Sequence, residues 1–364
     1  MITMFSMRAV TGCLPHSLIL LAAFQIHGQM ALCEKADSPV PAAVGLAQDH
    51  SQTGSAGAQD AFIRVSSNLV MVPVSVTSAD GKLVQDLEAR DFTIEENGQT
   101  QPIARMAEPG QVSMELALLF DLSGSVNHRF LFEQRAASEF LQLLVRPGDN
   151  ITLFSIGEEP RLLQTRTSDL QAALASLMAL VPTQSPTAFY DAVVLAARSS
   201  GESAGVEKRR VAVVLSDGED NNSQQYGLTD AVRAVQEADC IFYAINPVGA
   251  TVEMNDVSLG GQHAMESIAR QTGGMAFLPD TAEQLPAIFG RIAAELRAQY
   301  LLEYYSTDAR TDGRFRTILV KVPDRPDLRI RARQGYYAPR SEPRPRAAVV
   351  RVPTVNRSEA PAAH

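Results

Sequence analysis

Three oxygen-bearing side chains follow one apolar run in the stretch "LLFDLSGSVN" (119–128): Asp121, Ser123 and Ser125. Carboxylates and hydroxyls spaced in this way have three ordinary uses, which are capping a helix, taking part in catalysis and binding a cation. Taken singly, either serine is a typical N-cap for a following helix. The stretch by itself therefore leaves all three uses open.

Two later loops carry side chains of the same kind. Thr187 precedes a helical pattern in "TQSPTAFYDA" (183–192), and Asp217 follows an apolar strand pattern in "LSDGEDNNS" (215–223). In an open α/β sheet, ligands bind at the carboxyl ends of the strands, where these loops are expected to meet. The residues expected to gather at this edge are Asp121, Ser123, Ser125, Thr187 and Asp217.

Strand and helix patterns alternate along the part of the chain that contains these loops, residues 112–297. The run "MELALLF" (114–120) is almost continuously apolar, as in a strand that is covered on both faces. Over 128–145, apolar residues four apart, beginning at Phe132, predict a helix. This alternation predicts an α/β fold with a doubly wound, mainly parallel sheet and helices on both faces.

Two β segments flank this region, at 62–108 and 298–338. In the first, Asn97-Gly98 predicts a tight hairpin turn, and Pro73 suggests an edge strand. About three strands bury little apolar surface by themselves. We therefore expect the two segments to pair with each other in a small β-sandwich, with the α/β domain inserted between them.

The first 33 residues have the pattern of an export signal. Arg8 supplies a positive charge and "SLILLAAFQI" (17–26) supplies a short apolar core. A lipid anchor at Cys33 is disfavoured, because Leu32 is larger than the residue that usually precedes a lipidated cysteine. We expect a protein that is secreted, periplasmic or displayed on the cell surface.

The composition limits the classes of partner. The net charge of −9 argues against general nucleic-acid binding, and no segment after the signal is apolar enough to predict a membrane span in the mature chain. Residues 34–61 have the composition of a linker, and the Pro- and Arg-rich residues 339–364 that of a disordered tail.

The three loops together resemble the metal-ion-dependent adhesion site of the von Willebrand factor type A domain. The similar features are D-x-S-x-S at 121–125, the threonine before "AFYDA" and the aspartate of "SDG". Outside this domain, "VPVSVTSADGKLVQDLEARDFTIEENGQ" and "AAELRAQYLLEYYS" resemble a von Willebrand-type family described from acidobacteria.

The resemblance implies a role for each of the five residues. Ser123, Ser125 and Thr187 would give hydroxyls to a divalent cation, and Asp121 and Asp217 would act directly or through water. Oxygen ligands of this kind select Mg²⁺, with Mn²⁺ and Ca²⁺ as alternatives. The implied function is protein binding or adhesion, with a partner that presents an acidic side chain.

The sequence departs from the family at one place, and two other functions are compatible with the same fold. Ser185 and Pro186 stand where the family usually has glycines. The same fold could be a metal-free structural domain, or an aspartyl phosphotransferase-like enzyme with Asp121 as the nucleophile. Catalysis is disfavoured because Ser123 replaces the second acidic group and no lysine lies in the three loops.

Glu219 and Asp220 are expected to be solvated charges at the rim of the site. Tyr190 and Asp191 are expected to pack or hydrogen-bond within their loop.

Overall fold

The structure is a computed structural model that describes residues 69–108, 110–123, 129–201, 208–249 and 255–340. The expected signal and linker lie outside the described residues, and so do Ser125 and residues 341–364 of the expected tail. Arg340, which was expected to belong to the disordered tail, forms a β-bridge with Asp312. None of the described helices is long and apolar enough to cross a membrane.

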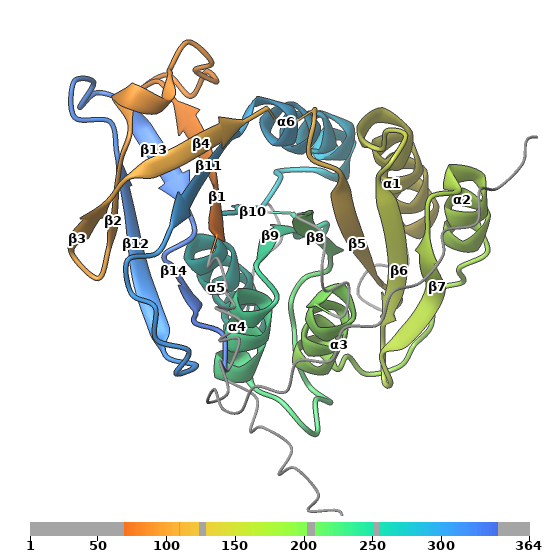
Figure 1. Ribbon diagram of the computed structural model, residues 1–364. Coiled ribbons are helices and arrows are strands. Elements are labelled where there is room, and N and C mark those ends of the chain that lie inside the picture. Colours follow the sequence, from red (N-terminus) through yellow and green to blue (C-terminus); the bar gives the residue numbers. More distant parts are fainter. Residues whose placement is uncertain (1–68, 109, 124–128, 202–207, 250–254, 341–364) are drawn as a thin grey trace, which may run out of the picture. The chain divides into compact units, whose positions relative to one another are not determined.

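A six-stranded sheet forms the centre of the α/β region (Figure 1). Its order is β10-β9-β8-β5-β6-β7, and every neighbouring pair is parallel except β6 and β7. Its strands are β5 (Met114–Asp121), β6 (Asn150–Ile156), β7 (Arg161–Thr167), β8 (Arg209–Leu215), β9 (Cys240–Ile245) and β10 (Ala276–Phe277).

Helices cover both faces of this sheet (Figure 1). Side chains at successive positions of a strand point to opposite faces. Leu118 of β5 therefore packs with α1 (Phe130–Leu144), α2 (Leu170–Met178) and α6 (Leu285–Ala298), which follows a short turn of 3-10 helix, η3 (Ala282–Gln284). Leu119 packs on the opposite face with α3 (Phe189–Gly201), α4 (Leu228–Glu237) and α5 (Asp256–Thr272). The predicted fold class is confirmed.

Strands from before and after the α/β region pair with each other in two antiparallel sheets. One sheet has the order β13-β1-β11-β4 and the other β14-β12-β2-β3. Val72 lies opposite Leu302, and both side chains belong to one apolar core between the sheets. The elements are β1 (Leu69–Thr77), η1 (Ala89–Asp91), β2 (Thr93–Glu96), β3 (Gln99–Gln101), β4 (Ile103–Ala107), β11 (Tyr300–Tyr305), β12 (Phe315–Lys321), β13 (Arg329–Ala332) and β14 (Gly335–Tyr337).

Local expectations are partly confirmed. Asn97 and Gly98 have φ angles of 48° and 79° and form the predicted hairpin turn between β2 and β3. The edge position predicted from Pro73 is wrong for its strand, because β1 lies between β13 and β11. Pro73 is tolerated there because β13 pairs only with Val74–Thr77.

The apolar face predicted for the first helix is confirmed at Ala136, Phe140 and Leu144, which are buried, and is wrong at Phe132. Phe132 is 37% exposed, whereas Phe130 and Glu133 are buried.

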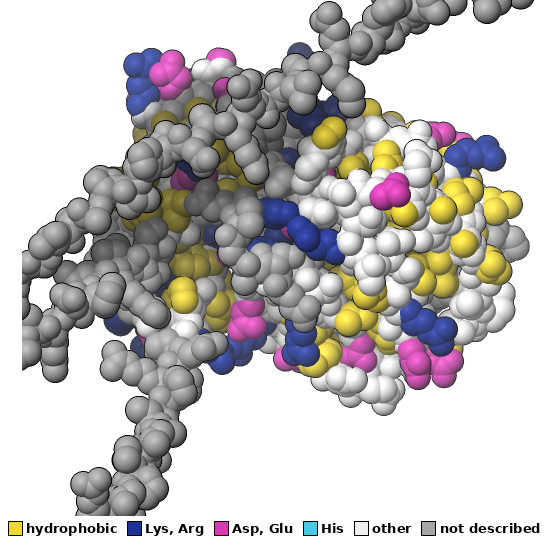
Figure 2. Space-filling model, turned by 45° about the vertical axis from the view of Figure 1, so that its right-hand side comes forward, with side chains coloured by type: hydrophobic (Ala, Val, Ile, Leu, Met, Phe, Trp, Pro, Cys, Tyr) yellow, Lys and Arg dark blue, Asp and Glu magenta, His cyan; other side chains and the backbone are white. Residues whose placement is uncertain are grey.

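On the face drawn in Figure 2, exposed hydrophobic side chains form small groups among polar and charged ones. Such scattered groups are normal for a protein surface.

Candidate functional site

The parallel pairing of β5 and β8 brings two of the predicted residues to one edge of the sheet. Phe120 lies opposite Leu215, so both strands end at the same level. Asp121 is the last residue of β5, and Asp217 is the second residue after β8. Both carboxyl groups are buried, with exposures of 1% and 3%.

Hydrogen bonds join the three predicted loops to one another. The Ser216 hydroxyl donates to Asp121 Oδ2 at 2.5 Å, which links the loops that follow β8 and β5. The backbone N–H of Thr187 donates to Asn221 Oδ1 at 2.7 Å. Thr183 donates its N–H to the carbonyl of Leu122 at 2.6 Å. Each loop is therefore bonded to the other two.

The predicted hydroxyl residues that the structure describes lie in this same cluster. Ser123 and Thr187 are each 4% exposed, and the N–H of Ser123 donates to Asp121 Oδ1 at 2.9 Å. The structure brings Asp121, Ser123 and Asp217 together, and Thr187 lies in the loop that is bonded to both of theirs. Ser125 was predicted for the same cluster but lies outside the described residues.

The electrostatics of the cluster are unfavourable to two ionised carboxylates. Burial and the neighbouring charge of Asp217 raise the pKa of Asp121 from 3.8 to about 6, against the lowering effect of hydrogen bonds from Ser216 and Ser123. The main causes of that shift include no cationic side chain of the described residues. A cation bound here would supply the missing positive charge.

A third buried carboxyl group, on Glu133 of α1, was missed by the sequence reasoning. It is 2% exposed, and its pKa is raised from 4.5 to about 8 by burial and by the charges of Asp121 and Asp217. Arg129 opposes that rise. The helical pattern gave no signal for this burial, because it favoured Phe132 as the residue on the covered face.

Asp220 holds the start of α3 and is not the solvated rim charge that was expected. Its Oδ1 accepts the backbone N–H groups of Phe189 at 2.8 Å and Tyr190 at 3.3 Å, as an N-cap side chain would. Asp191 accepts the N–H groups of Gln224 and Tyr226 at 3.0 Å, as expected for a residue that orders the loop. These bonds fix the loop next to Thr187.

The backbone around the site accounts for the residue types present. Among the described non-glycine residues, only Asn97 and Asp239 have positive φ, so Ser185 and Pro186 adopt ordinary backbone angles. Gly218 does require glycine, since its φ is +76° and an added Cβ would lie 2.7 Å from the carbonyl oxygen of Gly261. The loop after β8 is thereby packed directly on α5.

The donor set fits a hard divalent cation. All the predicted ligand atoms are carboxylate or hydroxyl oxygens, which suit Mg²⁺, Mn²⁺ or Ca²⁺. Within the described part of the chain, no three His, Cys, Asp or Glu side chains form a metal-binding group. Any cation at this edge would therefore depend on the hydroxyls of Ser and Thr as well as on the aspartates.

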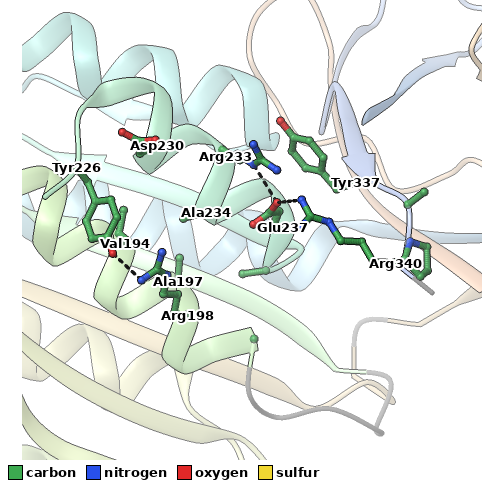
Figure 3. Close-up of a pocket in the computed structure, with 14 residues that line it drawn as sticks. Val194, Ala197, Arg198, Tyr226, Asp230, Arg233, Ala234, Glu237, Tyr337 and Arg340 are labelled. Atoms are coloured by element: carbon green, nitrogen blue, oxygen red, sulfur yellow. Dashed lines mark hydrogen bonds and ion pairs between the residues drawn. The ribbon is translucent and has the colours of Figure 1, made fainter. Parts of the chain in front are cut away.

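A large cavity lies elsewhere, between α3, α4 and the residues that follow β14 (Figure 3). Its volume is about 670 Å³, and none of the predicted cation ligands lines it. Its arginines already have partners: Arg198 donates to the Tyr226 hydroxyl at 2.7 Å, and Arg233 and Arg340 pair with Glu237.

Comparison with known proteins places one family on this region. Residues 116–219 match the family described as the von Willebrand factor type A domain. No curated protein matches the chain.

Three solved structures are similar to parts of the chain. The protein BatB from Bacteroides thetaiotaomicron is 18% identical over 50% of this chain and 98% of its own, with a TM-score of 0.40. A von Willebrand factor type A protein from Catenulispora acidiphila is 15% identical over 64% of this chain and 51% of its own, with a TM-score of 0.43. The vWF domain of a type V pili tip protein from Porphyromonas gingivalis is 13% identical over 50% of this chain and 94% of its own, with a TM-score of 0.41.

Proposed function

The chain contains a von Willebrand factor type A domain, and from this premise we propose that it is an exported module that binds a protein partner through a divalent cation. The cation is held at the carboxyl ends of β5 and β8 by Asp121, Ser123, Ser125, Thr187 and Asp217. Mg²⁺ is the expected ion, with Mn²⁺ and Ca²⁺ as substitutes.

One observation carries this proposal: two buried carboxyl groups from separate loops lie close enough for Asp217 to raise the pKa of Asp121. Burying two like charges is costly unless an opposite charge accompanies them. Ser123 and Thr187, buried in the same cluster, add neutral oxygen donors that need no further compensation.

The mixture of neutral and charged donors also favours an acidic partner. Hydroxyl ligands leave much of the positive charge of a bound divalent ion uncompensated, so the ion can accept a further carboxylate oxygen. The chain orients its own donors by fixed bonds, such as those from Ser216 and Ser123 to Asp121. A partner with an exposed Asp or Glu side chain matches this arrangement.

Thermal unfolding with and without metal tests the proposal. Millimolar Mn²⁺ or Mg²⁺ should raise the melting temperature of the wild-type protein over that in EDTA, since a ligand that binds only the folded state stabilises it. Asp121→Asn should abolish this rise, because the variant keeps the side-chain shape and loses the charge.

Asp149→Asn is the matched control. Asp149 is also a buried aspartate, but it lies at the amino end of β6, where it accepts the N–H of Met114 at 2.7 Å. This variant should melt at a lower temperature and keep its metal response. A wild-type melting curve that is indifferent to both EDTA and Mn²⁺ would overturn the proposal.

A further inference from the structure

A second polar cavity lies at the opposite edge of the central sheet, at the amino ends of β5 and β8. It has a volume of about 130 Å³ and is lined by residues 110–114, by the chain after α1, and by the side chains of three arginines. These are Arg146, Arg209 and Arg297. Nothing in the cation site described above involves this edge.

The positive charge of the cavity exceeds its negative charge. Asp149 is the single carboxylate among the lining residues, and both its oxygens are already occupied by backbone groups. Its Oδ1 accepts the N–H of Met114 at 2.7 Å, and its Oδ2 accepts the N–H of Arg146 at 2.9 Å. Three guanidinium groups therefore face one carboxylate, in a chain whose net charge is −9.

Arg209 is the buried member of this group and is incompletely bonded. It is 7% exposed, its Nη1 donates to the carbonyl of Leu296, and its Nε is buried without a hydrogen-bond partner among the described residues. Burial and the charge of Arg146 lower its pKa, which Asp149 and Tyr243 only partly oppose. An unpaired buried N–H is costly, so a native structure usually provides an acceptor for it.

Arg146 is the exposed member and has an unused guanidinium. No hydrogen bond or ion pair engages that group within the described part of the chain. Its Nη1 lies next to Gly110, 3.6 Å from the position that a Cβ would take there. The arginines of the larger cavity in Figure 3 differ, because each is bonded to a tyrosine or a glutamate. The smaller cavity thus combines spare donors with spare positive charge.

We propose that this cavity binds a small multivalent oxyanion, such as phosphate or sulfate, between Arg146, Arg209 and Arg297. Guanidinium groups match the oxygens of such anions in geometry and charge. The volume is about four times the roughly 30 Å³ that one water molecule occupies in the liquid, which suits a free ion better than an organic phosphate. The anion ties residues 110–113, which lead into β5, to the carboxyl ends of α1 and α6.

Binding of inorganic phosphate and sulfate to the full chain tests the proposal. Calorimetric titration in EDTA should show one site, and the melting temperature should rise saturably over that in chloride of equal ionic strength. Because EDTA is present, the result does not depend on the cation site. The absence of a saturable effect in the wild-type protein would overturn the proposal.

Two arginine variants distinguish anion binding at this site from a general effect of the protein's charge. Arg146→Gln removes a group that makes no bond to the described residues, so it should fold normally and bind the anion at least about tenfold more weakly. Arg198→Gln, in the larger cavity, is the matched control and should bind as the wild type does. Equal binding by Arg146→Gln and wild type, or equal weakening in both variants, would contradict the assignment.

A third arm distinguishes a free ion from the phosphate group of a larger molecule. Glycerol phosphate should bind more weakly than inorganic phosphate, because the cavity has little room for the ester. Equal or tighter binding of glycerol phosphate would overturn the assignment to a free ion.

Discussion

Glu133 and Asp121 show how strongly single residues near the proposed cation site depend on their surroundings. Both are acidic groups with raised pKa values, of about 8 and about 6, because they are buried near each other and near Asp217. In the folded protein each carboxyl group therefore holds its proton more tightly than in the unfolded chain, where the values are near 4.5 and 3.8. Ionisation of either group opposes folding.

The first prediction concerns the pH dependence of the metal-free protein. The folded-state pKa of Glu133 exceeds the unfolded value, so its favourable contribution is complete below pH 4.5 and is lost as the pH rises towards 8. The free energy of unfolding in EDTA should therefore fall between pH 5 and pH 8. Glu133→Gln should flatten this fall and stabilise the protein at pH 8 by up to a few kcal/mol, since one pKa unit corresponds to about 1.4 kcal/mol.

Urea unfolding at several pH values measures this effect. Glu139→Gln is a suitable control, because it changes an exposed glutamate of the same helix. Wild type and Glu133→Gln profiles that run parallel from pH 5 to pH 8 would show that Glu133 does not carry the dependence.

Sequence patterns identified some residues of the site and not others. Asp121, Thr187 and Asp217 could be predicted because each lies at or near the end of a buried strand or the start of a helix, and parallel strands end at a common edge. Ser216 and Glu133 could not, because their importance comes from side chains that meet across the fold. Neither local propensity nor periodicity reports such contacts.

At the scale of elements, helices α2 and α3 each begin with an aspartate cap, but the two aspartates come from different places in the sequence. Asp169 caps its own helix α2, by accepting the N–H groups of Gln171 at 2.9 Å and Ala172 at 3.1 Å. Asp220 caps α3 from a loop that is distant in sequence. Only the second cap lies in the loops of the proposed cation site.

The second prediction uses this difference. Asp220→Ala should cost about 1 kcal/mol of stability through loss of the cap, and it should also weaken Mn²⁺ binding, because the start of α3 positions Thr187. Asp169→Ala should cost a similar amount of stability and leave Mn²⁺ binding unchanged. Calorimetric titration of both variants gives the comparison, and equal Mn²⁺ affinities would refute a positioning role for Asp220.

The elements themselves were predictable to different degrees. The buried strands β5 and β8 were clear from their continuous apolar runs, and α6 from its helical pattern with Pro286 in its first turn. Strand β7 was not predicted, because "RLLQTRT" is mostly polar and none of its residues is buried. Its strand conformation depends on pairing with β6 at the edge of the sheet.

At the scale of the whole described region, one buried carboxylate joins the β-sandwich to the α/β domain. Glu295 of α6 accepts hydrogen bonds from Ser75 of β1 at 2.8 Å and from Tyr243 of β9 at 2.5 Å. Arg331 of β13 forms an ion pair with the same carboxylate and also donates to the carbonyl of Gly273. The two parts are therefore expected to unfold together.

The last prediction is that Glu295→Gln separates this unfolding into two steps. The substitution leaves Arg331 without its ionic partner in a mostly buried position, which should cost about 3 kcal/mol. Because the lost contacts connect the two parts, differential scanning calorimetry should show one transition for the wild type and two for the variant.

Glu115→Gln is the control for that measurement. Glu115 is also buried and pairs with Arg166 and Lys208, but all three residues belong to the α/β domain. Its loss should lower the melting temperature without splitting the transition, since no contact between the two parts is removed. If both variants keep a single transition, Glu295 stabilises the fold without coupling its parts, and the contacts of Arg333 with Met71 and Asp239 become the next to test.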